Sequence, residues 1–136
     1  MNCKSLSVLL GVSALAGIAL AAEVDLNKLP PAASREGVTF AKDIKPIFDK
    51  SCIKCHGPER PKARLRLDSL EATLKGSENG KVVEPGNSAK SILLHAVAHL
   101  LPKDEWMPPP NNRVNASPLT PEEIGLIRAW IEQGAR

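Results

Sequence analysis

Two cysteines and a histidine stand together in the segment CIKCH, residues 52–56. Cys52 and Cys55 are separated by two residues, and His56 follows the second cysteine directly. Thiolates and imidazoles bind zinc, paired thiols exchange with disulfides, and the pattern Cys-x-x-Cys-His is the attachment signal for covalent haem. Each of these three interpretations makes a different demand on the rest of the chain.

Zinc and thiol exchange are both poorly supported by the surrounding sequence. A structural zinc site uses four ligands, and His95 and His99, spaced i and i+4, are the residues that can complete a cysteine pair. That arrangement leaves His56 without a role. A thioredoxin-like pair stands at a helix N-terminus in a βαβ unit, whereas here a helix is predicted to precede the pair.

The haem interpretation gives every residue of the segment a function. The thiols of Cys52 and Cys55 add to the two vinyl groups of the haem as thioethers, and the imidazole of His56 becomes the proximal ligand of the iron. The spacing suits a short turn that spans the porphyrin edge and holds the histidine beneath the metal. The sequence therefore predicts one covalently bound haem c and its iron.

The sixth position of the iron needs a second ligand. Once Met1 is removed, Met107 is the only methionine, and it lies in the stiff proline-rich segment WMPPP between two predicted helices. Although a lone methionine is usually a core filler, this position favours Met107 as the distal ligand. His95 and His99 remain the alternative candidates.

The N-terminal residues predict export. Lys4 precedes an uncharged apolar run and an Ala-Leu-Ala cleavage pattern, so residues 1–22 read as a signal peptide, with an uncleaved membrane anchor as the alternative. Cleavage removes Cys3 and leaves only the CIKCH cysteines in an oxidising compartment, the periplasm or an equivalent exported location. We expect no stable membrane insertion after cleavage.

Net charge argues against nucleic acid as a partner. The formal charge of +3 falls to 3 − 1 = +2 when Lys4 leaves, which is too little for a nucleic-acid surface. Residues 42–66 are nevertheless enriched in basic side chains, eight against three acidic ones. This basic rim either steers an acidic protein partner or is ordinary solvated surface.

Helices must position the cofactor residues, and two of them are evident. Apolar residues at helical spacing from Phe40 to Phe48 predict a helix that runs into Cys52, interrupted or started by Pro46. Thr120, followed by proline and by glutamate three residues later, predicts a capped final helix through about Gly134. Other periodic segments are residues 69–74 and 87–101, whereas residues 23–37 read as a flexible or extended lead-in.

The chain resembles the planctomycete-type cytochrome c domain. The matching segments lie within residues 38–136: IKPIFDKSCIKCHG, LRLDS, VVEPGNSAKSILLHAV, the WMPP loop and LTPEEIGLIRAWIEQGA. The resemblance implies an all-α, cytochrome c-like fold with few helices and long loops wrapped round one covalent haem. It also implies that Cys52, Cys55, His56 and Met107 carry the haem. Arg64 and Arg66 are possible partners of the haem carboxylates.

A His/Met-ligated iron has no open coordination position, which suits electron transfer better than catalysis. The sequence therefore predicts a monomeric, exported electron carrier, not an enzyme, that exchanges single electrons with a redox protein donor and acceptor. The alternative is a haem-based sensor or haem enzyme in which Met107 is a displaceable ligand. Neither the partners nor the reduction potential follow from the sequence.

Overall fold

The computed structural model describes residues 24–136, so the predicted signal peptide and Cys3 lie outside the described part of the chain. The described residues are helical and contain no β-strand, in agreement with the all-α prediction. The α-helices are α1 (Lys45–Ser51), α2 (Ile53–His56), α3 (Leu70–Lys75), α4 (Ile92–Val97) and α5 (Pro121–Glu132). The shorter turns are η1 (Leu26–Lys28), η2 (Phe40–Ile44), η3 (Lys62–Arg64), η4 (Ser88–Lys90) and η5 (Lys103–Glu105).

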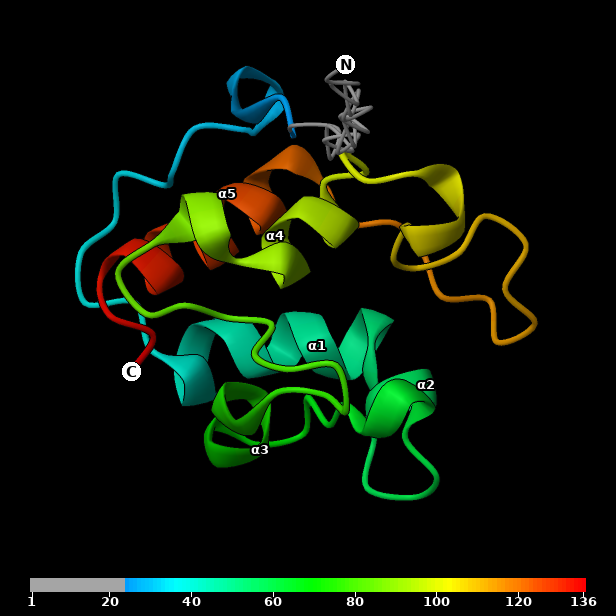
Figure 1. Cartoon of the computed structure of the whole chain (residues 1–136). Helices are drawn as coiled ribbons and strands as arrows, with labels where there is room; N and C mark the ends of the chain where they lie inside the picture. The colour runs from blue at the N-terminus through cyan, green and yellow to red at the C-terminus, as the bar shows by residue number, and fades with distance from the viewer. Residues whose placement is uncertain (1–23) are drawn as a thin grey trace, which may run out of the picture.

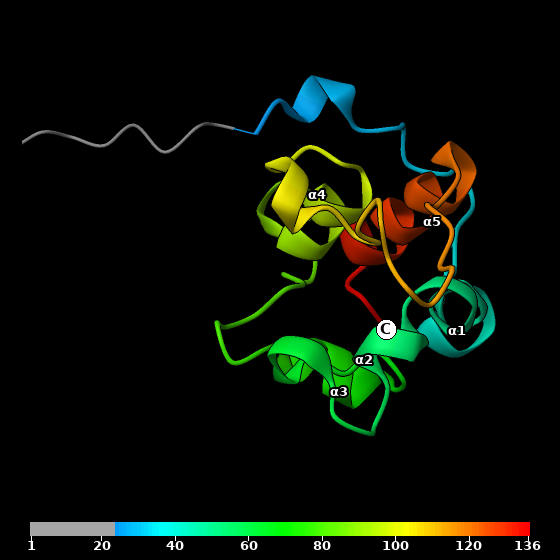
Figure 2. The same cartoon turned by 90° about the vertical axis from the view of Figure 1, so that its right-hand side faces the viewer.

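The helices form two groups with a connecting helix between them. Figures 1 and 2 both show α4 and α5 on one side of the molecule and α2 and α3 on the other. Helix α1 leads directly into α2 and lies between the two groups in Figure 1. Long loops link these short helices, as the resemblance implies. None of the described helices has the length and apolarity to cross a membrane.

The helix that leads to CIKCH begins at Phe40, with a widened turn ahead of Pro46. The N–H of Lys45 donates to the carbonyl oxygen of Phe40, which makes η2 a π-helical turn that continues into α1. A proline has no N–H and its ring crowds the carbonyl four residues earlier, so a wider turn just before it relieves that conflict. The predicted helix is therefore continuous and Pro46 modifies it without ending it.

Asp43 closes the start of this helix. Its Oδ2 accepts the N–H of Thr39 at 2.8 Å, and its Oδ1 lies 2.7 Å from the guanidinium of Arg35. The hydrogen bond from the Thr39 N–H is the largest effect on the Asp43 carboxyl and, with the charge of Arg35, it lowers the pKa of that group. The buried carboxylate thus links the N-terminal segment to the first turn of η2.

Helix α5 forms as its sequence predicts and supplies the centre of the core. The Thr120 hydroxyl accepts the Glu123 N–H at 3.2 Å while the Glu123 carboxylate accepts the Thr120 N–H at 2.9 Å, a complete capping box. Trp130 on this helix is fully buried and its ring lies 5.9 Å from that of Phe40. Phe48 packs edge-on against Phe40 at 5.9 Å, so three aromatic rings join η2, α1 and α5.

The segment expected to be a flexible or extended lead-in lies along α5. The N–H of Ala33 donates to the carbonyl oxygen of Gly125 at 2.9 Å, and the Arg128 guanidinium donates to the Pro30 carbonyl at 3.0 Å. Leu29 is buried among the core residues. The lead-in therefore packs along the final helix, with the short turn η1 at its start.

Helix α4 is shorter than the 87–101 segment suggested. Asn87 accepts the Lys90 N–H at 3.2 Å and so caps η4, and Ser91 separates that turn from α4. The apolar side chains of Ile92, Leu93, Ala96 and Val97 line a cavity instead of packing wholly against other helices. This explains why Ile92, although apolar, is 44% exposed.

Candidate functional site

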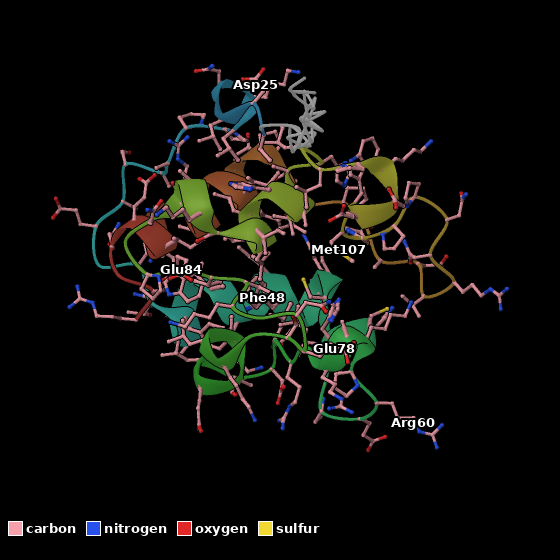
Figure 3. The ribbon with its side chains drawn as sticks, viewed as in Figure 1. Asp25, Phe48, Arg60, Glu78, Glu84 and Met107 are labelled. Atoms are coloured by element: carbon pink, nitrogen blue, oxygen red, sulfur yellow. The ribbon has the colours of Figure 1, made fainter. Side chains whose placement is uncertain are left out.

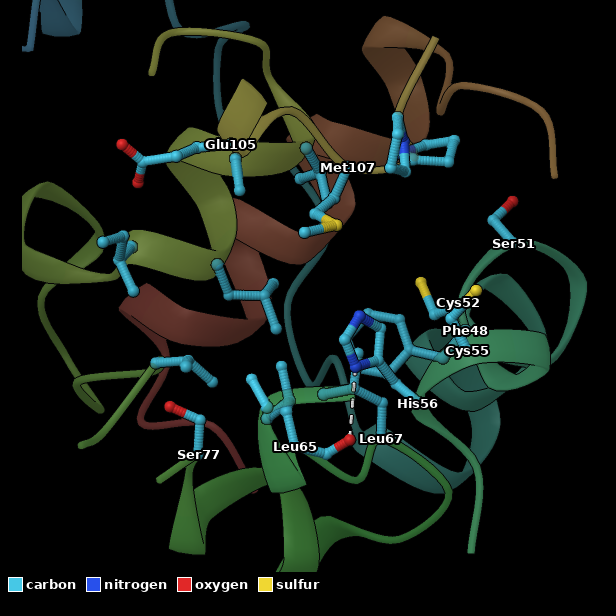
Figure 4. Close-up of a pocket in the computed structure, with 18 of the residues that line it drawn as sticks. Phe48, Ser51, Cys52, Cys55, His56, Leu65, Leu67, Ser77, Glu105 and Met107 are labelled. Atoms are coloured by element: carbon cyan, nitrogen blue, oxygen red, sulfur yellow. Dashed lines mark hydrogen bonds between the residues drawn. The ribbon is translucent and has the colours of Figure 1, made fainter. Parts of the chain in front are cut away.

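The CIKCH segment forms a single turn that presents three side chains to one cavity. Cys52 ends α1 and begins α2, and its carbonyl oxygen accepts the N–H groups of Cys55 at 3.1 Å and His56 at 2.9 Å. All three side chains line the same cavity, and Figure 4 shows both sulfurs and the imidazole directed toward it. The structure therefore brings together the residues predicted to attach a haem.

His56 is held in one orientation by the backbone that follows it. Its Nδ1 lies 3.2 Å from the Leu65 carbonyl oxygen, a contact in which Nδ1 carries the proton and donates it. The His56 carbonyl in turn accepts the N–H of Leu67 at 2.8 Å. Burial lowers the pKa of His56, against the opposing effect of the Leu65 hydrogen bond, and favours the neutral ring. This leaves Nε2 unprotonated and available as a metal ligand.

The two thiols are free, and the surroundings of Cys52 do not activate its thiol for disulfide exchange. Both cysteines are half-buried and unpaired. Burial, together with the neighbouring Cys55 and Glu123, raises the pKa of the Cys52 thiol to about 12. Exchange-active Cys-x-x-Cys pairs have the opposite property, a lowered thiol pKa. The environment therefore argues against a thioredoxin-like role.

Met107 lies on the other side of the cavity, near the end of α4. Its backbone N–H donates to the Ala96 carbonyl at 3.1 Å, which fixes the residue beside the helix. Figure 4 shows its sulfur pointing into the cavity from the α4 side, with His56 on the α2 side. The loop that carries it is braced by Trp106, whose Nε1 donates to the Leu101 carbonyl at 2.7 Å and whose ring stacks on His99 at 4.5 Å.

The cavity has the size and lining of a cofactor site. Its volume is about 370 Å³, within the range of ligand pockets, and most of its wall is apolar. Phe48, Leu65, Leu67, Leu93 and Val97 contribute to this wall. An apolar cavity with one imidazole, one thioether and two thiols is suited to a flat, largely apolar group that is anchored by sulfur and bound through a metal.

His95 and His99, the alternative ligands, do not line this cavity. His95 is buried, and its Nε2 has no hydrogen-bond partner among the described residues. His99 is stacked against Trp106. No cluster of three or more His, Cys, Asp or Glu side chains suited to a metal ion occurs within residues 24–136. The zinc interpretation therefore has no structural support in this part of the chain.

Comparison with known families gives a match that includes the CIKCH segment. Residues 52–111 match the model of the family described as Planctomycete cytochrome C. This segment of the chain is therefore similar to planctomycete-type cytochrome c domains. The match begins at Cys52 and includes Met107, and it is narrower than the region of resemblance, 38–136. No curated protein and no solved structure gives a significant match.

The residues that line the cavity fit a covalent haem. Two free thiols three residues apart lie at one edge of the cavity, as two thioether bonds require. The neutral, oriented imidazole of His56 and the sulfur of Met107 reach the same cavity from opposite groups of helices. Most of the cavity wall is apolar, which suits a macrocycle, and the charged side chains in its lining are Lys81, Asp104 and Glu105.

The structure also shows contributors that the sequence reasoning missed. The Leu65 carbonyl orients His56, and a backbone acceptor leaves no trace in residue type. The side chain of Asn112 makes three hydrogen bonds that shape the loop beside the cavity, to Pro109 and Ala116. An Asn-Asn pair after three prolines was the available signal for a turn of this kind.

Arg64 and Arg66, considered as partners of the haem carboxylates, do not line the cavity. Arg66 forms a bidentate contact with Asp68, at 2.9 Å and 2.6 Å. Arg64 lies 3.8 Å from a carboxylate oxygen of Glu78. Both arginines line a separate, polar hollow beside α3. The two arginines therefore contact acidic side chains of the protein itself, in place of the haem carboxylates that the sequence suggested as their partners.

Proposed function

We propose that this protein is an exported monohaem c-type cytochrome that carries single electrons between redox proteins. Cys52 and Cys55 would hold the haem as thioethers, and His56 and Met107 would ligate its iron. The observation that carries the proposal is that one apolar cavity gathers all four side chains, with His56 and Met107 on opposite sides of it. The family match supports a haem c protein.

The bound haem would supply a one-electron iron couple whose Met/His ligation raises the reduction potential. The protein's own residues position the two side chains that would ligate the iron. The Leu65 carbonyl holds His56 in one tautomer, and the Ala96 carbonyl holds Met107 beside α4. The mostly apolar wall offers water few hydrogen-bond partners in the space between them. An iron with both axial positions filled in such a site would favour electron transfer over reactions that need an open coordination position.

A protein partner with an acidic surface remains part of the proposal, although the basic rim is weaker than its composition suggests. Lys45 pairs with Asp49 at 2.7 Å, Lys50 pairs with Glu123, and Lys54 donates to the Val114 carbonyl at 3.0 Å. Exposed ion pairs of this kind partly neutralise the local charge. We therefore expect a modest ionic-strength dependence of docking, and a rate unaffected by salt would remove electrostatic steering from the account.

A carbon monoxide titration tests the proposal. The exported, haem-loaded protein is reduced, and its visible spectrum is recorded with and without carbon monoxide. We expect a six-coordinate spectrum that carbon monoxide leaves unchanged in the native protein and alters in Met107→Ala. Leu126→Ala is the matched control, because Leu126 is also a partly buried apolar side chain but does not line the cavity, so this variant should keep the six-coordinate spectrum. Ready binding of carbon monoxide by the native protein would favour the alternative, a sensor or enzyme with a displaceable Met107.

A further inference from the structure

On the side away from the cysteine pair, two segments form the rims of the cavity, and their cavity-lining side chains are opposite in charge. Figure 4 shows Ser77 and Glu105 on that side, with Cys52 and Cys55 across from them. One rim is the turn formed by residues 77–81, hereafter the Ser77–Lys81 turn. The other rim belongs to η5 and is acidic, because Asp104 and Glu105 line the cavity there.

The Ser77–Lys81 turn is fixed in place by its backbone. The N–H of Ser77 donates to the Gly80 carbonyl at 2.8 Å, and the N–H of Gly80 donates back to Ser77 at 3.2 Å. The N–H of Glu78 donates to the Ala63 carbonyl at 3.0 Å, which ties the turn to η3. Gly76 precedes it with φ +86°, and a Cβ there would meet the Gly80 oxygen at 2.4 Å. The turn therefore holds its side chains at a defined place on the rim.

Two side chains of this turn line the cavity with unused hydrogen-bond donors. Neither the Asn79 amide nor the Lys81 ammonium forms a side-chain hydrogen bond or ion pair within residues 24–136. The other lining amide, Asn112, is already occupied by its own loop. Opposite them, Asp104 and Glu105 have no ion-pair partner among the described residues. Glu78, the acidic residue of the turn, does not line the cavity and lies 3.8 Å from Arg64. Lys81 is therefore the charge that the turn presents to the cavity, whereas η5 presents two acids.

We propose that the Ser77–Lys81 turn receives the two carboxylates of the haem, with Lys81 as their counter-ion. This inference rests on the proposed function. The carboxylate side chains of a haem lie on the edge away from its vinyl groups, so attachment at Cys52 and Cys55 directs them to the far side of the cavity. There the acidic rim repels them, whereas Lys81 and the Asn79 amide offer charge-assisted hydrogen bonds.

Neutralising Lys81 in the haem-loaded protein tests this assignment. A cation near the cofactor favours the reduced state, so Lys81→Gln lowers the midpoint potential. The matched control is Lys75→Gln, which removes the same charge from α3, on the second hollow outside the cavity. Potentials of both variants and the native protein are measured by spectroelectrochemistry at low and high salt. We expect a downward shift for Lys81→Gln about twice that of the control or more, and one that persists at high salt because a direct contact is poorly screened.

Three outcomes are separable. A Lys81→Gln shift equal to that of Lys75→Gln, or one abolished by salt, overturns the assignment while leaving the proposed function intact. A structure of the haem-loaded protein with its carboxylates on the side of Asp104 and Glu105 does the same. Failure of the exported protein to retain haem overturns the proposed function and this inference together.

Discussion

The loop that holds Met107 depends on a hydrogen bond whose removal should open the site measurably. Trp106 Nε1 donates to the Leu101 carbonyl at 2.7 Å, and the indole stacks on His99 at 4.5 Å. Trp106→Phe keeps an aromatic ring for the stack and removes the donor. A net hydrogen bond contributes about 1 kcal/mol, so the equilibrium between bound and released Met107 should shift toward release by about fivefold.

Carbon monoxide binding to the reduced, haem-loaded protein measures that shift. It competes with the Met107 sulfur, so the apparent affinity should rise by the same factor, about fivefold. Trp130→Phe is the matched control, because Trp130 Nε1 also donates to a backbone carbonyl, that of Arg136 at 2.9 Å, but in the core away from the Met107 loop. It should lower the denaturant midpoint without changing carbon monoxide affinity. Equal affinities for Trp106→Phe and the native protein would refute the reasoning.

Three further predictions concern stability. Thr120→Ala removes half of the capping box and should lower the free energy of unfolding by about 1 kcal/mol in urea titration, with Thr120→Ser restoring most of it. Asp43, whose pKa is lowered by the Thr39 N–H and by Arg35, stabilises the fold above its unfolded pKa of about 3.9 and loses that effect as pH falls through its lower folded pKa. Asp43→Asn should therefore be less stable at neutral pH and show a flatter acid limb by thermal unfolding; identical acid limbs would contradict this. Gly125→Ala places a Cβ 2.6 Å from a backbone oxygen of the lead-in, so it should lower the melting temperature more than Ala129→Gly does. A smaller decrease for Gly125→Ala would contradict the packing of the lead-in against this helix.

The helix that begins at Phe40 and the final helix could be predicted from the sequence because short-range interactions determine them. The capping box at Thr120 and the spacing from Phe40 to Phe48 depend on neighbours within one or two turns. The widened turn before Pro46 could not be predicted in this way, because it forms only if the helix already begins at Phe40. The docking of the lead-in on Gly125 depends on residues nearly a hundred positions apart, which no local pattern encodes.

In the candidate site, too, some features could be predicted from residue type and others depend on the folded backbone. The residue types and spacing of CIKCH predict haem attachment, and the prediction of Met107 as a ligand rests on its loop and on the lack of other methionines once Met1 is removed. The Leu65 carbonyl and the Ser77–Lys81 turn have no such signature, because their roles arise from where the backbone places them. For Arg64 and Arg66 the residue type was misleading. It suggested contacts with the haem carboxylates, but these side chains contact Glu78 and Asp68.

The central claim is that Cys52 and Cys55 carry a covalent haem, and the mass of the denatured chain tests it most directly. The protein is exported from cells that mature c-type cytochromes, unfolded in acid and analysed by mass spectrometry. The account predicts one haem retained per chain, and loss of that covalent mass in the Cys52→Ser, Cys55→Ser double variant. A native chain that exports and folds but has two unmodified thiols and no added mass would contradict it.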